Sequence, residues 1–177
     1  MERSGYQEAG LNDQGLIFFL PNMTWGQPPF YSHQMISQSW QANAVHITSN
    51  ANSSLACPER LNRKQLKRWQ PGYGVDGCPG AFSAQASDDG KTLIVRFVNM
   101  GAGPVTLDLS VKNKDGAVPA SAKMHLLHSA HMTAVNTPAE PLHVSPTTLN
   151  MAPGTNFSSL AAVPVPPQSF TIIEVVF

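Results

Sequence analysis

The stretch Thr92-Leu-Ile-Val-Arg-Phe-Val98 decides the fold class of this chain. β-Branched and aromatic residues dominate it, and the turn sequence Asp88-Asp-Gly-Lys91 precedes it directly, a combination typical of a β-hairpin. Beyond the next turn, apolar and polar residues alternate over residues 105–111, as expected of a strand with one buried face. Neighbouring strands joined by short turns indicate an antiparallel sheet.

The chain downstream of these strands also favours β-structure. Residues 123–128 and 169–177 are predicted strands, because β-branched, aromatic and other apolar residues recur in them. Residues 129–167 are rich in proline and show little periodicity, so we expect a long ordered loop with one short strand near residues 142–144. Short strands between glycine and proline turns predict a jelly-roll-like antiparallel β-sandwich over residues 42–177.

Residues 1–41 have a different pattern. The run Leu16-Ile-Phe-Phe-Leu20 suits a strand that is buried on both faces. A polar turn over residues 21–27 follows, and Pro28-Pro29 can open a helix that continues to residue 40. This strand–loop–helix unit is the building block of α/β barrels, and a single unit cannot bury its own faces.

Composition and charge exclude several classes of partner. The 177 residues carry no net charge, and 12% of them are charged, which argues against nucleic acid. The longest apolar run, residues 16–20, is far shorter than the ~20 residues of a membrane helix, so we expect no membrane partner. A basic stretch over residues 60–68 lies beside Trp69 and Tyr73. A solvated loop is the favoured interpretation of this stretch, and a polyanion site is the alternative.

Cysteines and asparagines point to an oxidising compartment. Cys57 and Cys78 predict one disulfide that closes an insertion, with two free thiols as the alternative. Asn22, Asn52 and Asn156 each begin a tripeptide that can accept an N-linked glycan. These features favour an extracellular or secretory setting for the parent protein. The N-terminus lacks an apolar segment behind its charges, so we expect the export signal upstream of this chain.

The residues needed for catalysis are not evident. Hydrolysis of a glycoside normally needs two carboxylates that face one bond, whereas the acidic residues here fall mostly in turns or on strand surfaces. His125, His128 and His131 have the spacing of a helical metal-binding face, but the first two lie on a predicted strand and point to opposite sides. We therefore expect no catalytic residue, no metal site and no cofactor in this chain.

The segment Trp25-Gly-Gln27 is the candidate binding site. An indole face and an amide that both donates and accepts hydrogen bonds are what a sugar site uses. The alternative is that Trp25 and the nearby Tyr31 only pack in the core.

Five motifs carry a resemblance to a known family. They are Asn12-Asp-Gln-Gly-Leu-Ile-Phe-Phe19, Thr24-Trp-Gly-Gln-Pro-Pro-Phe-Tyr31, His33-Gln-Met-Ile-Ser37, the stretch over residues 133–146, and Val165-Pro-Pro-Gln-Ser-Phe-Thr-Ile-Ile173. In order and spacing they resemble the plant-type α-L-arabinofuranosidases of glycoside hydrolase family 51. The first three resemble the end of the catalytic barrel, and the last two resemble the C-terminal β-sandwich.

The resemblance implies a (β/α)8 barrel with two catalytic glutamates, followed by the sandwich. Residues 16–20 would be the eighth barrel strand, both glutamates would precede this chain, and the missing barrel would be a packing partner. Gln27, with Trp25 beside it, would contact the arabinose of an arabinan or arabinoxylan-type polysaccharide. The insertion over residues 57–80 departs from the family pattern. An alternative from another class is a standalone β-sandwich that binds carbohydrate or a partner without chemistry.

Overall fold

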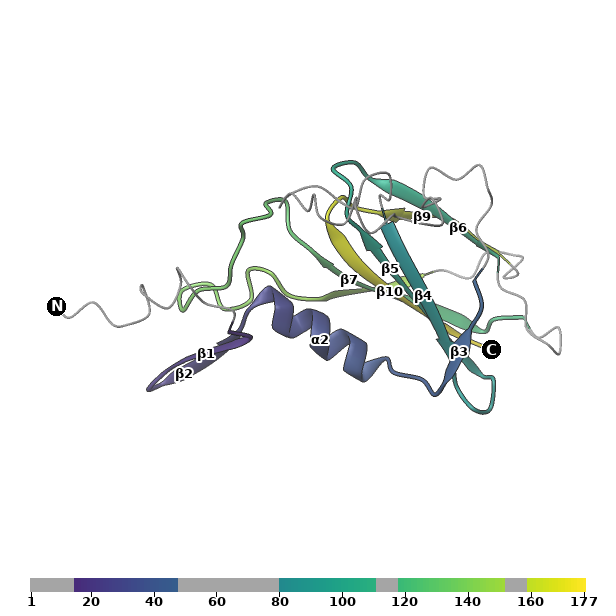
Figure 1. The fold of residues 1–177 in the computed structure, drawn as a ribbon, viewed down its shortest axis with the longest axis horizontal. Coiled ribbons are helices and arrows are strands. Elements are labelled where there is room, and N and C mark those ends of the chain that lie inside the picture. Colours follow the sequence, from purple (N-terminus) through teal and green to yellow (C-terminus); the bar gives the residue numbers. More distant parts are fainter. Residues whose placement is uncertain (1–14, 48–79, 111–117, 152–158) are drawn as a thin grey trace, which may run out of the picture.

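A six-stranded antiparallel sheet forms the centre of the fold (Figure 1). The computed structural model describes residues 15–47, 80–110, 118–151 and 159–177. The strands of this sheet, in spatial order, are β3 (Asn43–Val45), β4 (Gly80–Ala86), β5 (Thr92–Asn99), β10 (Ser169–Val176), β7 (Ser121–His128) and β8 (Thr147–Met151). The C-terminal strand β10 thus lies inside the sheet, between two strands that come earlier in the chain.

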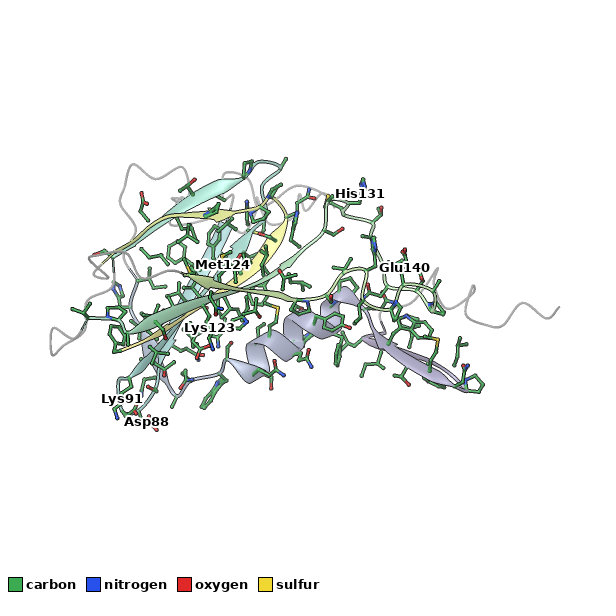
Figure 2. All side chains as sticks on the ribbon, turned by 180° about the vertical axis from the view of Figure 1, so that it is seen from behind. Asp88, Lys91, Lys123, Met124, His131 and Glu140 are labelled. Atoms are coloured by element: carbon green, nitrogen blue, oxygen red, sulfur yellow. The ribbon has the colours of Figure 1, made fainter. Side chains whose placement is uncertain are left out.

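A second sheet packs on one face of the first and completes a sandwich. It consists of β6 (Val105–Ser110) and β9 (Ser159–Val165). The core between the two sheets contains Ala84, Val95, Phe97, Leu107, Ala122, Met124, Val163, Val165, Ile173 and Val175. On β7, Met124 points into this core and Lys123 points away from it, because successive side chains of a strand alternate between its faces (Figure 2). The predicted antiparallel β-sandwich is confirmed.

The helix α2 (Pro28–Gln38) covers the opposite face of the six-stranded sheet (Figure 1). Proline occupies its first positions, where a backbone N–H has no partner within the helix. A second core between helix and sheet contains Tyr31, Met35, Ile94, Leu127, Val144 and Ile172. The predicted helix is confirmed and ends two residues before Trp40. No helix in the described ranges has the length and apolar character that crossing a membrane requires.

The central strands are therefore buried on both faces. Ile172 is 1% exposed and packs with the helix, whereas Ile173 is 0% exposed and packs between the sheets. This explains why the sequence of β10 is apolar almost without interruption. The core that contains Ile172 also joins α2 to the six-stranded sheet.

The segment before α2 differs from the expected single buried strand. β1 (Ile17–Leu20) pairs antiparallel with β2 (Met23–Gly26), a stretch that the sequence predicts to be a polar turn. The backbone N–H of Gln27 donates to the carbonyl oxygen of Leu16 at 2.9 Å and closes this hairpin. Backbone polar groups need partners, and a two-residue turn at Pro21 and Asn22 brings the nearest ones into reach. Phe19 stays 80% exposed, so β1 is not buried on both faces.

Residues 129–167 also contain more structure than expected. The strand predicted near residues 142–144 is absent, and β8 and β9 lie further along the chain. β8 pairs with β7, and β9 pairs with β6, so both strands obtain partners that are remote in sequence. The hairpin signal over residues 88–91 is confirmed: Gly90, at the turn between β4 and β5, has a φ of +68°, which glycine adopts without strain.

Candidate functional site

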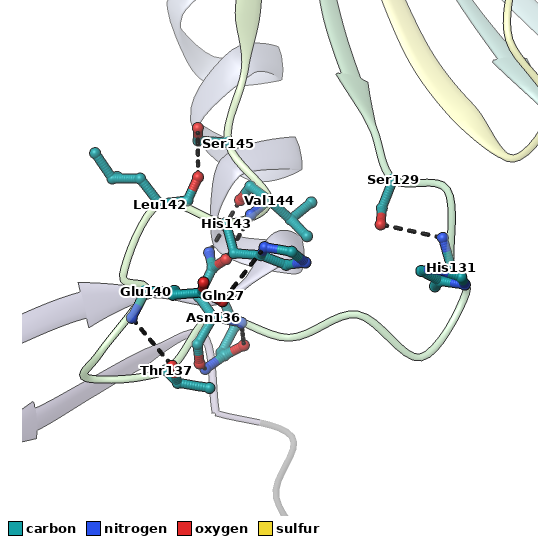
Figure 3. Close-up of polar contacts among 10 residues, drawn as sticks. All are labelled: Gln27, Ser129, His131, Asn136, Thr137, Glu140, Leu142, His143, Val144 and Ser145. Carbon is teal, nitrogen blue, oxygen red and sulfur yellow. Dashed lines mark hydrogen bonds and ion pairs between the residues drawn. The ribbon is translucent and has the colours of Figure 1, made fainter.

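Asn136 lies at the centre of the candidate site and is 1% exposed (Figure 3). Its carbonyl oxygen accepts hydrogen bonds from Trp25 Nε1 at 3.1 Å and from Gln27 Nε2 at 2.7 Å. Its backbone N–H donates to Gln27 Oε1 at 3.1 Å. The backbone N–H and C=O of Asn136 thus hold together the two residues that the sequence singles out, although Asn136 comes more than a hundred residues later in the chain.

The side chain of Asn136 makes a second set of contacts. Its Nδ2 donates to the carbonyl oxygens of Gly26 at 2.7 Å and Val144 at 2.9 Å. Its Oδ1 accepts a hydrogen bond from the backbone N–H of Val144 at 2.7 Å. Val144 is 4% exposed and belongs to the core beneath α2. The carboxamide therefore closes the loop over residues 136–144 and ties that loop to the end of β2.

Gln27 occupies the N-cap position of α2, but its side chain does not cap the helix. Both ends of its amide instead pair with the backbone of Asn136, in the way that a neighbouring strand would. An amide group has two N–H donors and an oxygen with two lone pairs. The two contacts therefore orient the amide and leave one N–H and one lone pair uncommitted by them.

Trp25 is 3% exposed, and its ring is stacked on Phe18 with centroids 5.8 Å apart. Gly26 follows it, and a side chain at that position would collide with the ring of Phe30. Close packing of the loop against the first turn of α2 thus requires glycine at this position. Trp25 and Tyr31 both contribute to packing, which is the alternative role that the sequence leaves open for them.

A shallow hollow of about 440 Å³ opens beside these residues. It lies between the β1–β2 hairpin, the start of α2 and the loop over residues 136–144. Its lining consists of Ile17, Thr24, Trp25, Gly26, Phe30, Tyr31, Pro141 and Leu142. Aromatic and aliphatic side chains with a few hydroxyl and indole groups suit a neutral ligand with one apolar face, because no lining residue carries a charge.

The acidic residues of the described part of the chain are Asp88, Asp89, Asp108, Glu140 and Glu174. Asp88 and Asp89 lie in the exposed turn between β4 and β5, next to Lys91 (Figure 2). Glu140 lies 3.6 Å from the ring of His143, and Glu174 lies 3.6 Å from that of His125. These contacts join carboxylates to nitrogen groups, unlike the paired carboxylates of a glycosidase.

The three histidines with the predicted metal-binding spacing, His125, His128 and His131, lie on β7 and in the loop that follows it. His125 contacts Thr148 Oγ1 at 2.9 Å as well as Glu174, and His131 lies in the loop after β7 (Figure 3). In the described ranges, no three His, Cys, Asp or Glu side chains come together in a group that could hold a metal ion.

The remaining predicted sites fall in different parts of the chain. Asn22 is exposed in the turn between β1 and β2, where a glycan would meet no obstruction from burial. Cys57, Cys78, Asn52 and Asn156 lie outside the described residues, as does the basic stretch over residues 60–68. Sequence reasoning missed Asn136, although it lies inside one of the motifs that carry the family resemblance.

Similarity in sequence to known proteins is weak. No protein-family model matches the chain, and no curated protein matches it. Solved structures do match in fold. An arabinose-bound MgGH51 α-L-arabinofuranosidase aligns with a TM-score of 0.67 over 91% of this chain, at 14% identity. In fold, the chain is similar to part of a family 51 α-L-arabinofuranosidase.

Other structures give the same result. The thermostable GH51 α-L-arabinofuranosidase from Thermotoga petrophila RKU-1 aligns over 91% of this chain with a TM-score of 0.64 and 18% identity. The GH51 arabinofuranosidase from Xanthomonas axonopodis pv. citri aligns over 92% with a TM-score of 0.58 and 14% identity. This chain covers 21% of the MgGH51 enzyme, 31% of the Thermotoga enzyme and 29% of the Xanthomonas enzyme.

Proposed function

We propose that this chain is the C-terminal region of a plant-type α-L-arabinofuranosidase of glycoside hydrolase family 51. The complete enzyme would remove terminal α-L-arabinofuranosyl groups from arabinan or arabinoxylan-type polysaccharides. The observation that carries the proposal is the alignment of 91% of this chain with a fifth of an arabinose-bound family 51 enzyme. The motifs at both ends of the chain support it independently, because they resemble the same family in the same order.

In this proposal the β1–β2 hairpin and α2 end the catalytic barrel, and the β-sandwich supports them. Gln27 would hydrogen-bond the arabinose, and Trp25 would shape the sugar subsite from its buried position beside Gln27. The acid/base and nucleophile would both come from polypeptide outside these 177 residues. Four of the five described carboxylates, those of Asp88, Asp89, Glu140 and Glu174, support this assignment, because their contacts are those of turns and strand surfaces.

Exposed apolar side chains support the presence of further polypeptide on the hairpin. Ile17 is 52% exposed and Leu142 is 65% exposed, and both line the hollow. Phe19, two positions after Ile17 on β1, is 80% exposed. A two-stranded hairpin is marginally stable without a third strand or a packed face. The barrel is the partner that we propose for this surface.

An assay of the chain with an aryl α-L-arabinofuranoside tests the placement of the catalytic groups. We expect no turnover above that of a boiled sample. Clear turnover would show that the carboxylate pair lies within these residues and would overturn the proposal. Full-length transcripts provide the positive test: in-frame upstream sequence should encode further strand–helix units with a glutamate at the ends of two strands.

Titration with arabino-oligosaccharides tests the sugar site itself. The NMR signal of the Trp25 indole N–H, which shares the Asn136 carbonyl oxygen with the Gln27 amide, should shift on addition of an arabino-oligosaccharide and stay unchanged with a cello-oligosaccharide of equal length. Gln27→Ala should abolish the response, and Gln38→Ala, at an exposed glutamine of the same helix, should leave it intact. A response that survives Gln27→Ala would contradict the proposed role of this residue.

A standalone carbohydrate-binding module is the second candidate function. The hollow beside Trp25 and Tyr31 favours it, because an apolar lining without charge suits a sugar face. Point variants must separate the two functions, since deletion of residues 16–40 would remove Tyr31 and Met35 from the core beneath the sheet. Tight binding by the unmodified chain, with no longer transcript in the source tissue, would favour the module.

A further inference from the structure

Asn136 uses both its backbone N–H and C=O and its side-chain carboxamide to bridge parts of the chain that are far apart in sequence. Its backbone N–H and C=O make three hydrogen bonds with the side chains of Trp25 and Gln27. Three hydrogen bonds of its carboxamide go to the backbones of Gly26 and Val144. All the partners except Val144 belong to one three-residue segment, which immediately precedes α2.

The chemistry of this arrangement selects asparagine. The carboxamide must donate twice, to two carbonyl oxygens, and accept once, from a backbone N–H. Aspartate has the same size but offers no donor, so two buried carbonyl oxygens would face a carboxylate. Alanine would leave three buried backbone groups without these partners. At 1% exposure, water cannot replace them from the surface.

We propose that Asn136 is a positioning residue, which fixes the orientation of the Gln27 amide and the Trp25 indole for ligand binding. The inference rests on the proposed function for its choice of ligand. By taking one N–H and one lone pair of Gln27, the backbone of Asn136 determines where the remaining donor and acceptor point. A ligand hydroxyl then meets a preorganised partner, and no rotation of the amide has to be frozen on binding.

The loop over residues 136–144 thereby helps to determine the geometry of the site. Hydrogen bonds between the Asn136 carboxamide and the Val144 backbone close this loop and thereby fix the position of the Asn136 backbone. Val144 packs in the same core as Tyr31 and Met35, so the loop and α2 are anchored in one hydrophobic core. The β-sandwich consequently sets the geometry of a binding residue that belongs to the barrel segment.

Hydrogen exchange in the full 177-residue chain tests the inference without any ligand. In Asn136→Asp, we expect the exchange of the Trp25 indole N–H and of the Gln27 side-chain N–H to accelerate about tenfold or more. The backbone amides of Ile172 and Ile173 in β10 should keep their protection within about a factor of two. Asn150→Asp, at an exposed asparagine on β8, is the matched control and should change none of these rates.

Binding to an arabino-oligosaccharide, measured on the same proteins, separates this inference from the proposed function. If the unmodified chain binds the sugar, Asn136→Asp should weaken binding about tenfold or more, and Asn150→Asp should not. If the unmodified chain binds no sugar, these residues alone do not form the proposed sugar site, while faster exchange in Asn136→Asp still supports the positioning role. Unchanged exchange and unchanged sugar affinity in a folded Asn136→Asp would overturn the inference.

A second variant covers the case in which Asn136→Asp does not fold. Gln27→Glu keeps the acceptor for the Asn136 N–H but places a carboxylate oxygen against the Asn136 carbonyl. We expect faster exchange of the Trp25 indole N–H at neutral pH. Protection should return below about pH 4, where the introduced carboxyl is protonated and can donate again. The measured rates are first corrected for the pH dependence of intrinsic exchange. If the Trp25 indole N–H of Gln27→Glu is then protected equally at neutral pH and below about pH 4, the inference is overturned.

Discussion

Arg96 on β5 donates a 2.7 Å hydrogen bond from Nη2 to the carbonyl oxygen of Ser39, the C-cap residue of α2. Its Nε and Nη2 also donate to Ser39 Oγ, and its Nη1 donates to Gln85 Oε1 at 2.7 Å. Arg96 is 8% exposed, and burial lowers the pKa of its guanidinium, which still remains protonated near neutral pH. A cation at the C-terminus of a helix interacts favourably with the helix dipole. Arg96 therefore fixes the end of α2 to the sheet, at the opposite end from Asn136.

Arg96→Met should destabilise the protein by about 1–3 kcal/mol, because Ser39 and Gln85 would lose their buried donors. Urea unfolding followed by circular dichroism gives the free energy of unfolding. Lys123→Met, which removes a cation from an exposed position on β7, should change it by less than about 0.5 kcal/mol. Equal stability of Arg96→Met and the unmodified chain would mean that desolvation of the guanidinium cancels its hydrogen bonds.

Gly80→Ala should also destabilise the protein, by about 1–3 kcal/mol. A Cβ at Gly80 would lie 2.6 Å from the ring of Phe97, which is 1% exposed, and 2.8 Å from the carbonyl oxygen of Val98. Gly103→Ala is the matched control, because a Cβ there meets nothing within 4 Å. Gly80→Ala should therefore lower the midpoint of thermal unfolding, and Gly103→Ala should not. Similar midpoints for both variants would contradict the close contact of β4 with Phe97.

Ile172→Ala and Ile173→Ala should each cost about 2–5 kcal/mol in the free energy of unfolding. Ile172 is buried beneath α2, and Ile173 is buried between the two sheets. Leu149→Ala, at a position on β8 that is 50% exposed, provides the control and should cost much less. Tolerance of Ile172→Ala, with a severe effect of Ile173→Ala, would show that α2 does not cover the sheet in solution.

Stability should fall in acid partly through Asp89. A 2.6 Å hydrogen bond from Ser87 Oγ, followed by one from the Lys91 N–H, lowers the pKa of the Asp89 carboxyl in the folded chain. A lowered folded pKa means that this carboxylate stabilises the fold above its ordinary pKa, near pH 4, and that the contribution disappears as the pH falls through the folded value. Asp89→Asn should therefore flatten the decline in thermal midpoint below about pH 4.

Asp88→Asn is the charge-matched control for this measurement. It removes the same charge from the same turn but leaves the contacts of Asp89 with Ser87 and Lys91 in place. If both variants change the pH dependence equally, net charge and not these hydrogen bonds accounts for the effect.

Local patterns in the sequence predicted most of the individual elements. The hairpin turn before residue 92, the strands over 105–110 and 169–176, and the helix that begins at Pro28 all lie where the sequence places them. Each depends on neighbours within a few positions: period two for strands, a glycine in a turn, a proline at a helix start. β2 and β8 escaped prediction because their residues carry no such signal and gain order from partner strands.

The candidate site shows the same division. Trp25 and Gln27 were recognisable from residue type and from a resemblance to family 51, and the hydrogen bonds that hold them were not. Their partner, Asn136, is separated from Gln27 by 109 positions, and asparagine in a proline-rich loop is locally consistent with any turn. Only the packing of the loop against the hairpin turns this asparagine into the centre of the site.

The sequence by itself determined where strands, turns and the helix form, because those preferences are set by each residue and its near neighbours. Tertiary structure alone decided that β10 is enclosed on both faces, that the hairpin folds back on itself and that Asn136 faces Gln27. The physical reason is that burial and buried hydrogen bonds depend on which distant segments come into contact, and this information lies in no single stretch of the chain.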